Sequence, residues 1–256
     1  MDYSFLQEKK KIVVKDLFKG GRVFIWGGVI ILLLMVFTPP IPLAGSHARW
    51  SAVAARGKDI YIAITDANSA RKPLGLPPLW PKTYLAYTNH LDDVSAKMFK
   101  TSSDYFYELY DGSNAGTDQH DPYVRGFDYS KLAGPDVAAK YGQGKLASSN
   151  NMWLIAANLT DEDDDLIPVL ITRNVDVSAI ERAINYGIKT NDFKTKILLG
   201  KGDYKTPFGN KGFVCVRKGG GTFNHQSRYA NLGILFNGQE RPPRDPAKPK
   251  IVYLMP

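Results

Sequence analysis

The residues with the clearest capacity for chemistry form the acidic run at residues 160–165, TDEDDD. Calcium takes about six to eight oxygen ligands, and Asp161, Asp163 and Asp165 alternate as they would in a ligand loop. The calcium-loop motif is incomplete, because no glycine stands at its sixth position and no glutamate closes it. The same acids suit a hairpin turn that needs only water. We therefore expect a solvated turn and no cofactor, with calcium as the alternative ligand of these three residues.

A catalytic constellation is not visible in the sequence. There is no G-x-S-x-G elbow, no H-E-x-x-H, and no glycine loop with the spacing of a phosphate site. In residues 118–121, DQHD, Asp121 could orient the imidazole of His120. A local pair without a nucleophile makes no mechanism, so a solvated turn is the simpler interpretation. The glycines of residues 218–221 predict a turn between strands. We expect no enzymatic activity.

The longest apolar segment, residues 23–44, contains no charged residue. A helix rises ~1.5 Å per residue, so about 20 apolar residues cross a ~30 Å bilayer core. Pro39, Pro40 and Pro42 predict a kink or loosening at the outer end. We predict one transmembrane segment at residues 23–44, with membrane lipid as its surroundings.

The flanks of this segment set its expected orientation. Residues 1–22 are rich in Lys and Arg, and positive flanks stay cytoplasmic. We therefore expect a cytoplasmic leader at residues 1–22 and the bulk of the chain outside. A cleaved secretory signal ending near Ala44 is the alternative, and it would leave a secreted soluble protein. The long basic region and the length of the apolar run favour a retained anchor.

Composition limits what the rest of the chain can be. The 256 residues are 44% hydrophobic and 12% aromatic, which permits one substantial core beyond the anchor. The net charge is +8, but no dense basic run follows the apolar segment, so nucleic acid is not an expected partner. Cys215 is the single cysteine, so no intrachain disulfide can form.

Hydrophobic periodicity predicts the elements of this core. Trp50, Val53, Ile60 and Ile64 recur at helical steps, which predicts an amphipathic stalk helix over residues 45–72, capped by Ser46. A proline-rich connector follows, then a helix at residues 103–111, capped by Thr101 or Ser102 and ended by Gly112. Later segments predict a helix at 178–186 and strands at 152–159, 168–175, 195–199, 213–218, 230–236 and 250–255. This order indicates an α+β head domain, residues 73–256, with an antiparallel sheet.

A basic leader, an apolar helix prolonged into a stalk and an α+β head together resemble the type IV pilin-like proteins. The likeness is to the pseudopilins of bacterial type II secretion systems, in particular the subgroup of the major pseudopilin. It is carried by the segments ARGKDIYIAITDANSARKPLGLPPLWPKT, SSDYFYELYD, MWLIAANLTDEDDDLIPVLITRNV and TPFGNKGFVCVRKGGG. The resemblance implies a pilin-like fold, in which a long N-terminal helix packs on an antiparallel sheet. It also implies a structural subunit of the bacterial inner membrane, with a periplasmic or extracellular head and other pilin-like subunits as partners.

The N-terminus departs from the family pattern. The resemblance implies cleavage between Gly20 and Gly21, where family members have a phenylalanine after the cleaved glycine and a glutamate at the fifth mature position. Gly21 and Ile25 stand at those places. The departure is typical of a diverged subunit that stays uncut. The alternative class is an anchored envelope domain with a small-ligand or hydrolase site, built on His120 and Asp121 or on the acids of residues 161–165.

Overall fold

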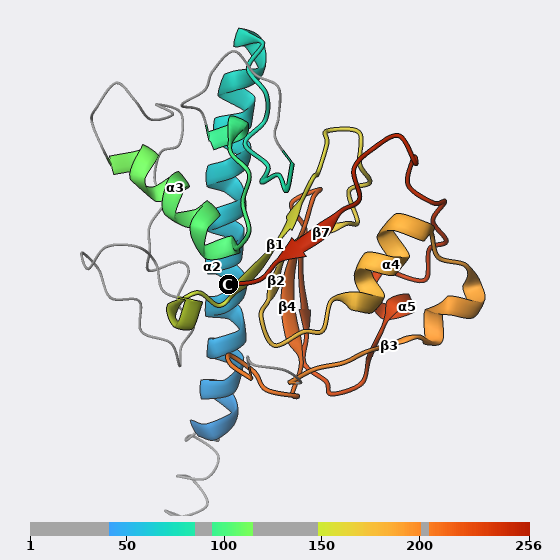
Figure 1. The fold of residues 1–256 in the computed structure, drawn as a ribbon. Helices are drawn as coiled ribbons and strands as arrows, with labels where there is room; N and C mark the ends of the chain where they lie inside the picture. Colours follow the sequence, from blue (N-terminus) through green and yellow to red (C-terminus); the bar gives the residue numbers. More distant parts are fainter. Residues whose placement is uncertain (1–40, 85–93, 115–147, 201–204) are drawn as a thin grey trace, which may run out of the picture. The chain divides into compact units, whose positions relative to one another are not determined.

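The computed structural model describes residues 41–84, 94–114, 148–200 and 205–256 (Figure 1). The chain divides into two compact units, Met1–Ala48 and Arg49–Pro256. Every side-chain contact below lies within the second unit. Residues 1–40 lie outside the described part, so the leader and most of the expected transmembrane segment stay predictions. Among the helices that are described, none is long and apolar enough to cross a membrane.

Helix α2, Ile41–Arg71, is the longest described element. Val53, Ile60, Ile64 and Ala67 are buried along one stripe, as their helical spacing predicts. The continuous helix over residues 46–70 is therefore confirmed. The expected N-cap is wrong, because Ser46 lies inside the helix.

The core of the head is a five-stranded antiparallel sheet in the order β5-β4-β2-β1-β7. Its strands are β1 (Trp153–Ala157), β2 (Pro168–Thr172), β4 (Phe213–Arg217), β5 (Thr222–His225) and β7 (Val252–Leu254). Every residue of β1 and β2 is buried, which accounts for their continuous rather than alternating apolar sequences. The expected α+β class with an antiparallel sheet is confirmed.

Helices lie against both faces of this sheet (Figure 1). Helix α2 runs along one face, while α4 (Ser178–Tyr186) and α5 (Leu232–Leu235) lie on the other side. The second side also carries a two-stranded sheet of β3 (Lys196–Ile197) and β6 (Ala230–Asn231), next to the 3-10 turn η5 (Thr190–Lys194). This second layer explains why both faces of the central strands are apolar.

Helix α3, Ser102–Asn114, joins the sheet at the ends of β1 and β7. Thr101 Oγ1 accepts a hydrogen bond from Asp104 N at 3.0 Å, which confirms Thr101 as a cap. Ser102 Oγ donates to Trp153 O, and Ser102 N donates to Met255 O. The expected end at Gly112 is wrong, because α3 continues to Asn114. Short 3-10 turns complete the described chain: η1 (Lys72–Leu74), η2 (Val94–Ala96) and η4 (Ser148–Asn150).

The structure has a two-residue strand followed by a short helix where the sequence predicted one longer strand. Residues 230–236, ANLGILF, are apolar enough for a strand, yet only Ala230–Asn231 is extended and Leu232–Leu235 is helical. The Asn231 side chain accepts a hydrogen bond from Ile234 N at 2.8 Å, so it caps the short helix. Strand β5 was missed, because its alternating exposed and half-buried residues carry a weak apolar signal.

Candidate functional site

The first candidate site is the contact between α2 and the sheet. A β-carbon on Gly57 would lie 2.6 Å from Trp153 Cη2 and 3.0 Å from Val216 Cγ2, so only glycine allows this approach. Trp50 stacks on Phe208 with ring centroids 3.6 Å apart. These contacts fix the distance and the register between the helix and strands β1 and β4.

Two polar side chains of α2 hold the β4–β5 turn. Lys58 Nζ donates to Gly220 O at 2.5 Å, and Tyr61 OH donates to Lys218 O. Burial, with a smaller contribution from Asp165, raises the pKa of Tyr61, so its hydroxyl stays a donor. The expected glycine turn between strands is confirmed. Its carbonyl groups face α2, which leaves no role for an anion in this contact.

The outward side of α2 carries small, acidic and apolar side chains. Ala52 and Ala55 are exposed, Ile62 is 41% exposed, and Asp66 is exposed on the same side. Small side chains let another helix approach closely. Among the described residues, Ala52 and Ala55 therefore leave room for a neighbouring helix to approach this side of α2.

The C-terminal end of α2 is anchored by a buried arginine. Arg71 is 2% exposed, and its Nε donates to Pro77 O at 2.9 Å while its Nη2 donates to Ser95 Oγ at 3.3 Å. Asn68 Oδ1 accepts from Leu79 N at 2.7 Å. The proline connector is thus fixed on the helix. Sequence reasoning missed Arg71, since a terminal arginine usually lies in solvent.

The acidic turn, residues 160–167, is the second candidate site, and four basic side chains surround it. Four of its five consecutive acids each pair with a different base: Glu162 with Lys248 (2.5 Å), Asp163 with Arg244, Asp164 with Arg241 (3.0 Å) and Asp165 with Lys218 (3.7 Å). Three of the four bases come from residues 241–248. The turn therefore ties the segment before β7 to the β1–β2 connection.

The Asp163–Arg244 pair is the buried member of this set. Its side chains are 7% and 6% exposed, and Asp163 also accepts from Thr160 N and Oγ1. Burial raises the pKa of Asp163, but hydrogen bonds from Arg244 and Thr160 outweigh that effect, so the pKa lies below its ordinary value. Asp163 is therefore a carboxylate in the folded protein, and its charge is compensated.

These pairs bear on the proposed calcium ligands. Asp163 is engaged by Arg244 and Thr160, whereas Asp165 is 79% exposed beside Lys218, and Asp161 is exposed. In the part of the chain that the structure describes, no three His, Cys, Asp or Glu side chains are placed to hold a metal ion. The expectation of a turn is confirmed, and the buried carboxylate within it, Asp163, contacts the guanidinium of Arg244.

The other residues singled out in the sequence fall in different places. Gly20, Gly21, His120 and Asp121 lie outside the described residues, so their roles stay predictions. His225 Nε2 lies 2.9 Å from Tyr229 O at the end of β5. None of the described contacts brings His225 to a nucleophile.

Asn158, the first residue of the sequon at residues 158–160, is a structural residue. It is 4% exposed and its φ is 66°, a left-handed conformation that asparagine tolerates. Its side chain donates to Thr83 Oγ1 and Lys250 O and accepts from Thr83 N. The side-chain nitrogen is therefore not accessible to a glycosylating enzyme in the folded state.

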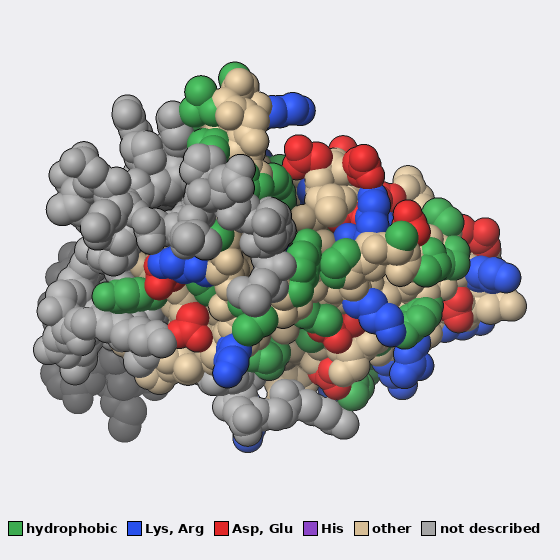
Figure 2. Space-filling model, turned by 45° about the horizontal axis from the view of Figure 1, so that its top comes forward, with side chains coloured by type: hydrophobic (Ala, Val, Ile, Leu, Met, Phe, Trp, Pro, Cys, Tyr) green, Lys and Arg blue, Asp and Glu red, His purple; other side chains and the backbone are tan. Residues whose placement is uncertain are grey.

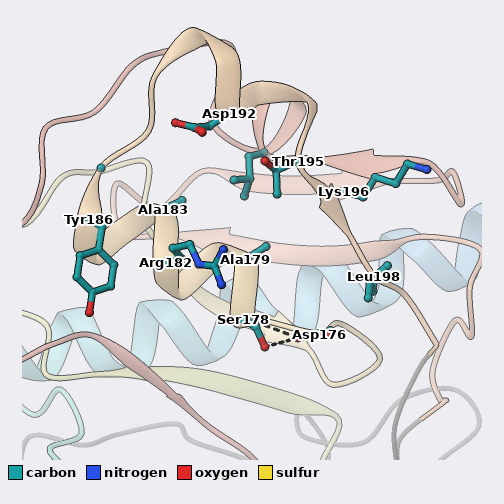
Figure 3. Close-up of a pocket in the computed structure, with 12 residues that line it drawn as sticks. Asp176, Ser178, Ala179, Arg182, Ala183, Tyr186, Asp192, Thr195, Lys196 and Leu198 are labelled. Carbon is teal, nitrogen blue, oxygen red and sulfur yellow. Dashed lines mark hydrogen bonds between the residues drawn. The ribbon is translucent and has the colours of Figure 1, made fainter.

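The third candidate site is a pocket of about 450 Å³ on the α4 side of the sheet (Figure 3). Helix α4 provides Ala179, Arg182 and Ala183, and Thr195 and Leu232 stand among the residues across from it. Its size is within the range of small-ligand sites. Ser178 Oγ donates to Asp176 Oδ1 at 2.6 Å, and no histidine lines the pocket, so a hydrolytic triad is not assembled there.

Comparison with known proteins gives no relative. No family model, no curated protein and no solved structure matches this chain. The candidate sites are therefore interpreted from their own geometry.

Proposed function

We propose that this chain is a membrane-anchored, pilin-like structural subunit of a type II secretion system or a related pilus-type assembly. Residues 1–22 are the cytoplasmic leader, residues 23–44 cross the bacterial inner membrane, and the head lies in the periplasm or outside the cell. The subunit acts by packing against other pilin-like subunits and catalyses no reaction. The observation that supports this proposal best is the continuous α2 helix, Ile41–Arg71, which is held against the sheet at Gly57.

The contacts of α2 support a mechanical role. Gly57 allows the helix to approach β1 and β4 closely, and Lys58 and Tyr61 fix the β4–β5 turn to it. A force on the helix would therefore be passed to the whole sheet. The exposed small residues of α2 leave room for the helix of a neighbouring subunit. Figure 2 shows acidic and basic side chains interspersed over the face in view, which suits a structural head better than a nucleic-acid surface.

Cysteine crosslinking in native membranes tests this proposal. Cys215 is fully buried, and burial raises its pKa to about 12 although Arg217 lowers it, so the native thiol is unreactive. A cysteine introduced by Ala55→Cys is then the reactive thiol. We expect oxidation of membranes containing A55C to yield disulfide-linked dimers, or adducts with cysteine variants of pilin-like partners.

A matched variant controls for random collision. Tyr229 is 67% exposed and lies after β5, outside helix α2, so Y229C has a comparably accessible thiol. Dimers from A55C but not from Y229C support assembly through the helix. Equal yields from both variants, or no crosslinking from either, count against a pilin-like subunit.

The pocket supports a second candidate, an anchored envelope domain that binds a small ligand. Its size and its mixed charged and apolar lining favour this alternative over a hydrolase. The two functions are compatible in one chain, since the pocket and the outward side of α2 are separate surfaces.

A further inference from the structure

The pocket beside α4 has a lining that matches one class of ligand. Its apolar part is formed by Ala179, Ala183, Leu198 and Leu232, of which Ala183 and Leu232 are buried. A floor of two alanines on one helix is flat and shallow, because alanine is the smallest side chain with a β-carbon. An aliphatic side chain could lie on it and remove this apolar surface from water.

Arg182 is the cation that faces this floor. Figure 3 shows its side chain lying along α4 between Ala179 and Ala183, among the residues that line the pocket. Among the residues that the structure describes, its guanidinium has no ion-pair or hydrogen-bond partner, in contrast to Arg71 and Arg244. A guanidinium presents a planar fork that binds carboxylates in two-point contacts. Arg182 is thus available for a carboxylate that comes from outside the chain.

Negative charge lies at the same pocket. Asp192 Oδ2 accepts from Lys189 N at 2.9 Å, and its second oxygen has no partner within the described parts of the chain. Asp176 lines the pocket at the start of α4 and accepts from Ser178 N and Oγ. The lining thus carries two acids, Asp176 and Asp192, and two bases, Arg182 and Lys196. A ligand that carries both a negative and a positive charge matches this lining better than a simple anion or a simple cation.

We propose that this pocket binds a zwitterionic ligand with an aliphatic side chain, namely a short apolar peptide such as a dipeptide. Its carboxylate binds Arg182, its ammonium group faces the carboxylates of Asp176 and Asp192, and its side chain lies on Ala179 and Ala183. A pocket of about 450 Å³ has room for such a ligand. The inference does not depend on the pilin-like role, because it uses only residues on the opposite side of the sheet from α2.

Saturation-transfer NMR on the full-length chain in detergent tests the proposal, with leucyl-leucine as the probe. We expect saturable binding of the dipeptide and binding at least about tenfold weaker for N-acetyl-leucyl-leucine amide, which lacks both charges. Arg182→Gln should weaken the dipeptide about tenfold, since it removes the charged fork. Ala179→Leu should also weaken it, by filling the floor without changing any charge.

The control is Arg228→Gln, because Arg228 is an exposed arginine beside Tyr229 and outside the pocket. Thermal melting followed by circular dichroism establishes that each variant folds. We expect the melting temperature of R182Q to equal that of the wild type, since Arg182 is exposed. The proposal is overturned if leucyl-leucine shows no saturable signal. It is equally overturned if R182Q binds as tightly as R228Q, or if the capped peptide binds as well as the zwitterion.

Discussion

Gly57 of α2 lies directly against Trp153 of β1, so close that a β-carbon at residue 57 would come 2.6 Å from Trp153 Cη2. Glycine normally weakens a helix, by about 1 kcal/mol relative to alanine. Its presence inside a long helix therefore needs a packing reason, and the indole ring supplies one. The contact joins the helix to β1, an inner strand of the sheet.

Replacing Gly57 tests this contact. Gly57→Val should lower the stability of the folded chain by about 1–3 kcal/mol, because the added carbons overlap Trp153 and Val216. Thermal melting followed by circular dichroism measures the loss. Ala55→Val is the matched control on the same helix, since Ala55 is exposed. Equal melting temperatures for the two variants would mean that the helix is not held against the sheet as described.

The buried ion pair of the acidic turn makes a second prediction. Arg244→Met leaves the carboxylate of Asp163 buried without its cation, which should cost about 3–5 kcal/mol. Lys248→Met, the control, breaks a pair whose acid, Glu162, is 79% exposed, so its effect should be much smaller. Urea unfolding of the two variants gives both values. A loss from K248M as large as that from R244M would contradict the burial of the Asp163–Arg244 pair.

The pH dependence of stability should report on Glu181. Burial is the largest effect on the pKa of Glu181 and raises it, and the charge of Asp176 raises it further. The hydrogen bond from Tyr253 N lowers the pKa, but the net pKa of Glu181 lies above its ordinary value. The folded chain thus keeps a proton that the unfolded chain releases. This contribution to stability is present at low pH and is lost as pH rises through the folded pKa.

Glu181→Gln removes this titration and keeps an oxygen that can accept from Tyr253 N. We therefore expect E181Q to gain melting temperature relative to the wild type as pH is raised from about 4 to 7. The control Glu162→Gln changes an exposed acid of the same type. A difference between E181Q and the wild type that is the same at both pH values would show that Glu181 has no raised pKa.

Calcium provides a fourth prediction. Four acids of the turn already pair with Lys and Arg, so adding calcium or a chelator should leave the melting temperature of the chain unchanged. Differential scanning calorimetry in each condition measures it. A rise in melting temperature on adding calcium, abolished by Asp161→Asn or Asp165→Asn, would establish the calcium site that the sequence offered as an alternative.

Elements with strong periodicity could be predicted from the sequence. The stripe from Trp50 to Ile64 predicted helix α2 and its buried side, and the apolar runs around β1, β2 and β4 predicted the sheet. Helix α4 was predicted to the residue, Ser178–Tyr186. These signals are local, because burial on one side of a helix or within a sheet repeats along the chain.

The partners of the candidate sites could not be predicted in the same way. Arg244 lies about 80 residues from Asp163, and nothing in either segment alone indicates the pair. The pocket likewise depends on how Thr195 and Leu232 fold against α4. At residues 230–236, a single side-chain cap by Asn231 overrode an apolar run that favoured a strand. Long-range packing and single hydrogen bonds decide such cases.

The proposed role as an anchored subunit requires that residues 23–44 remain joined to α2 in the mature chain. The intact mass of the chain, isolated from the membrane fraction of cells that express it, measures this directly. We predict a chain that begins at Met1, or at Gly21 if processed, and that is recovered with the membranes. A mature chain that begins near Gly45 and is recovered in the soluble fraction would contradict the anchored subunit.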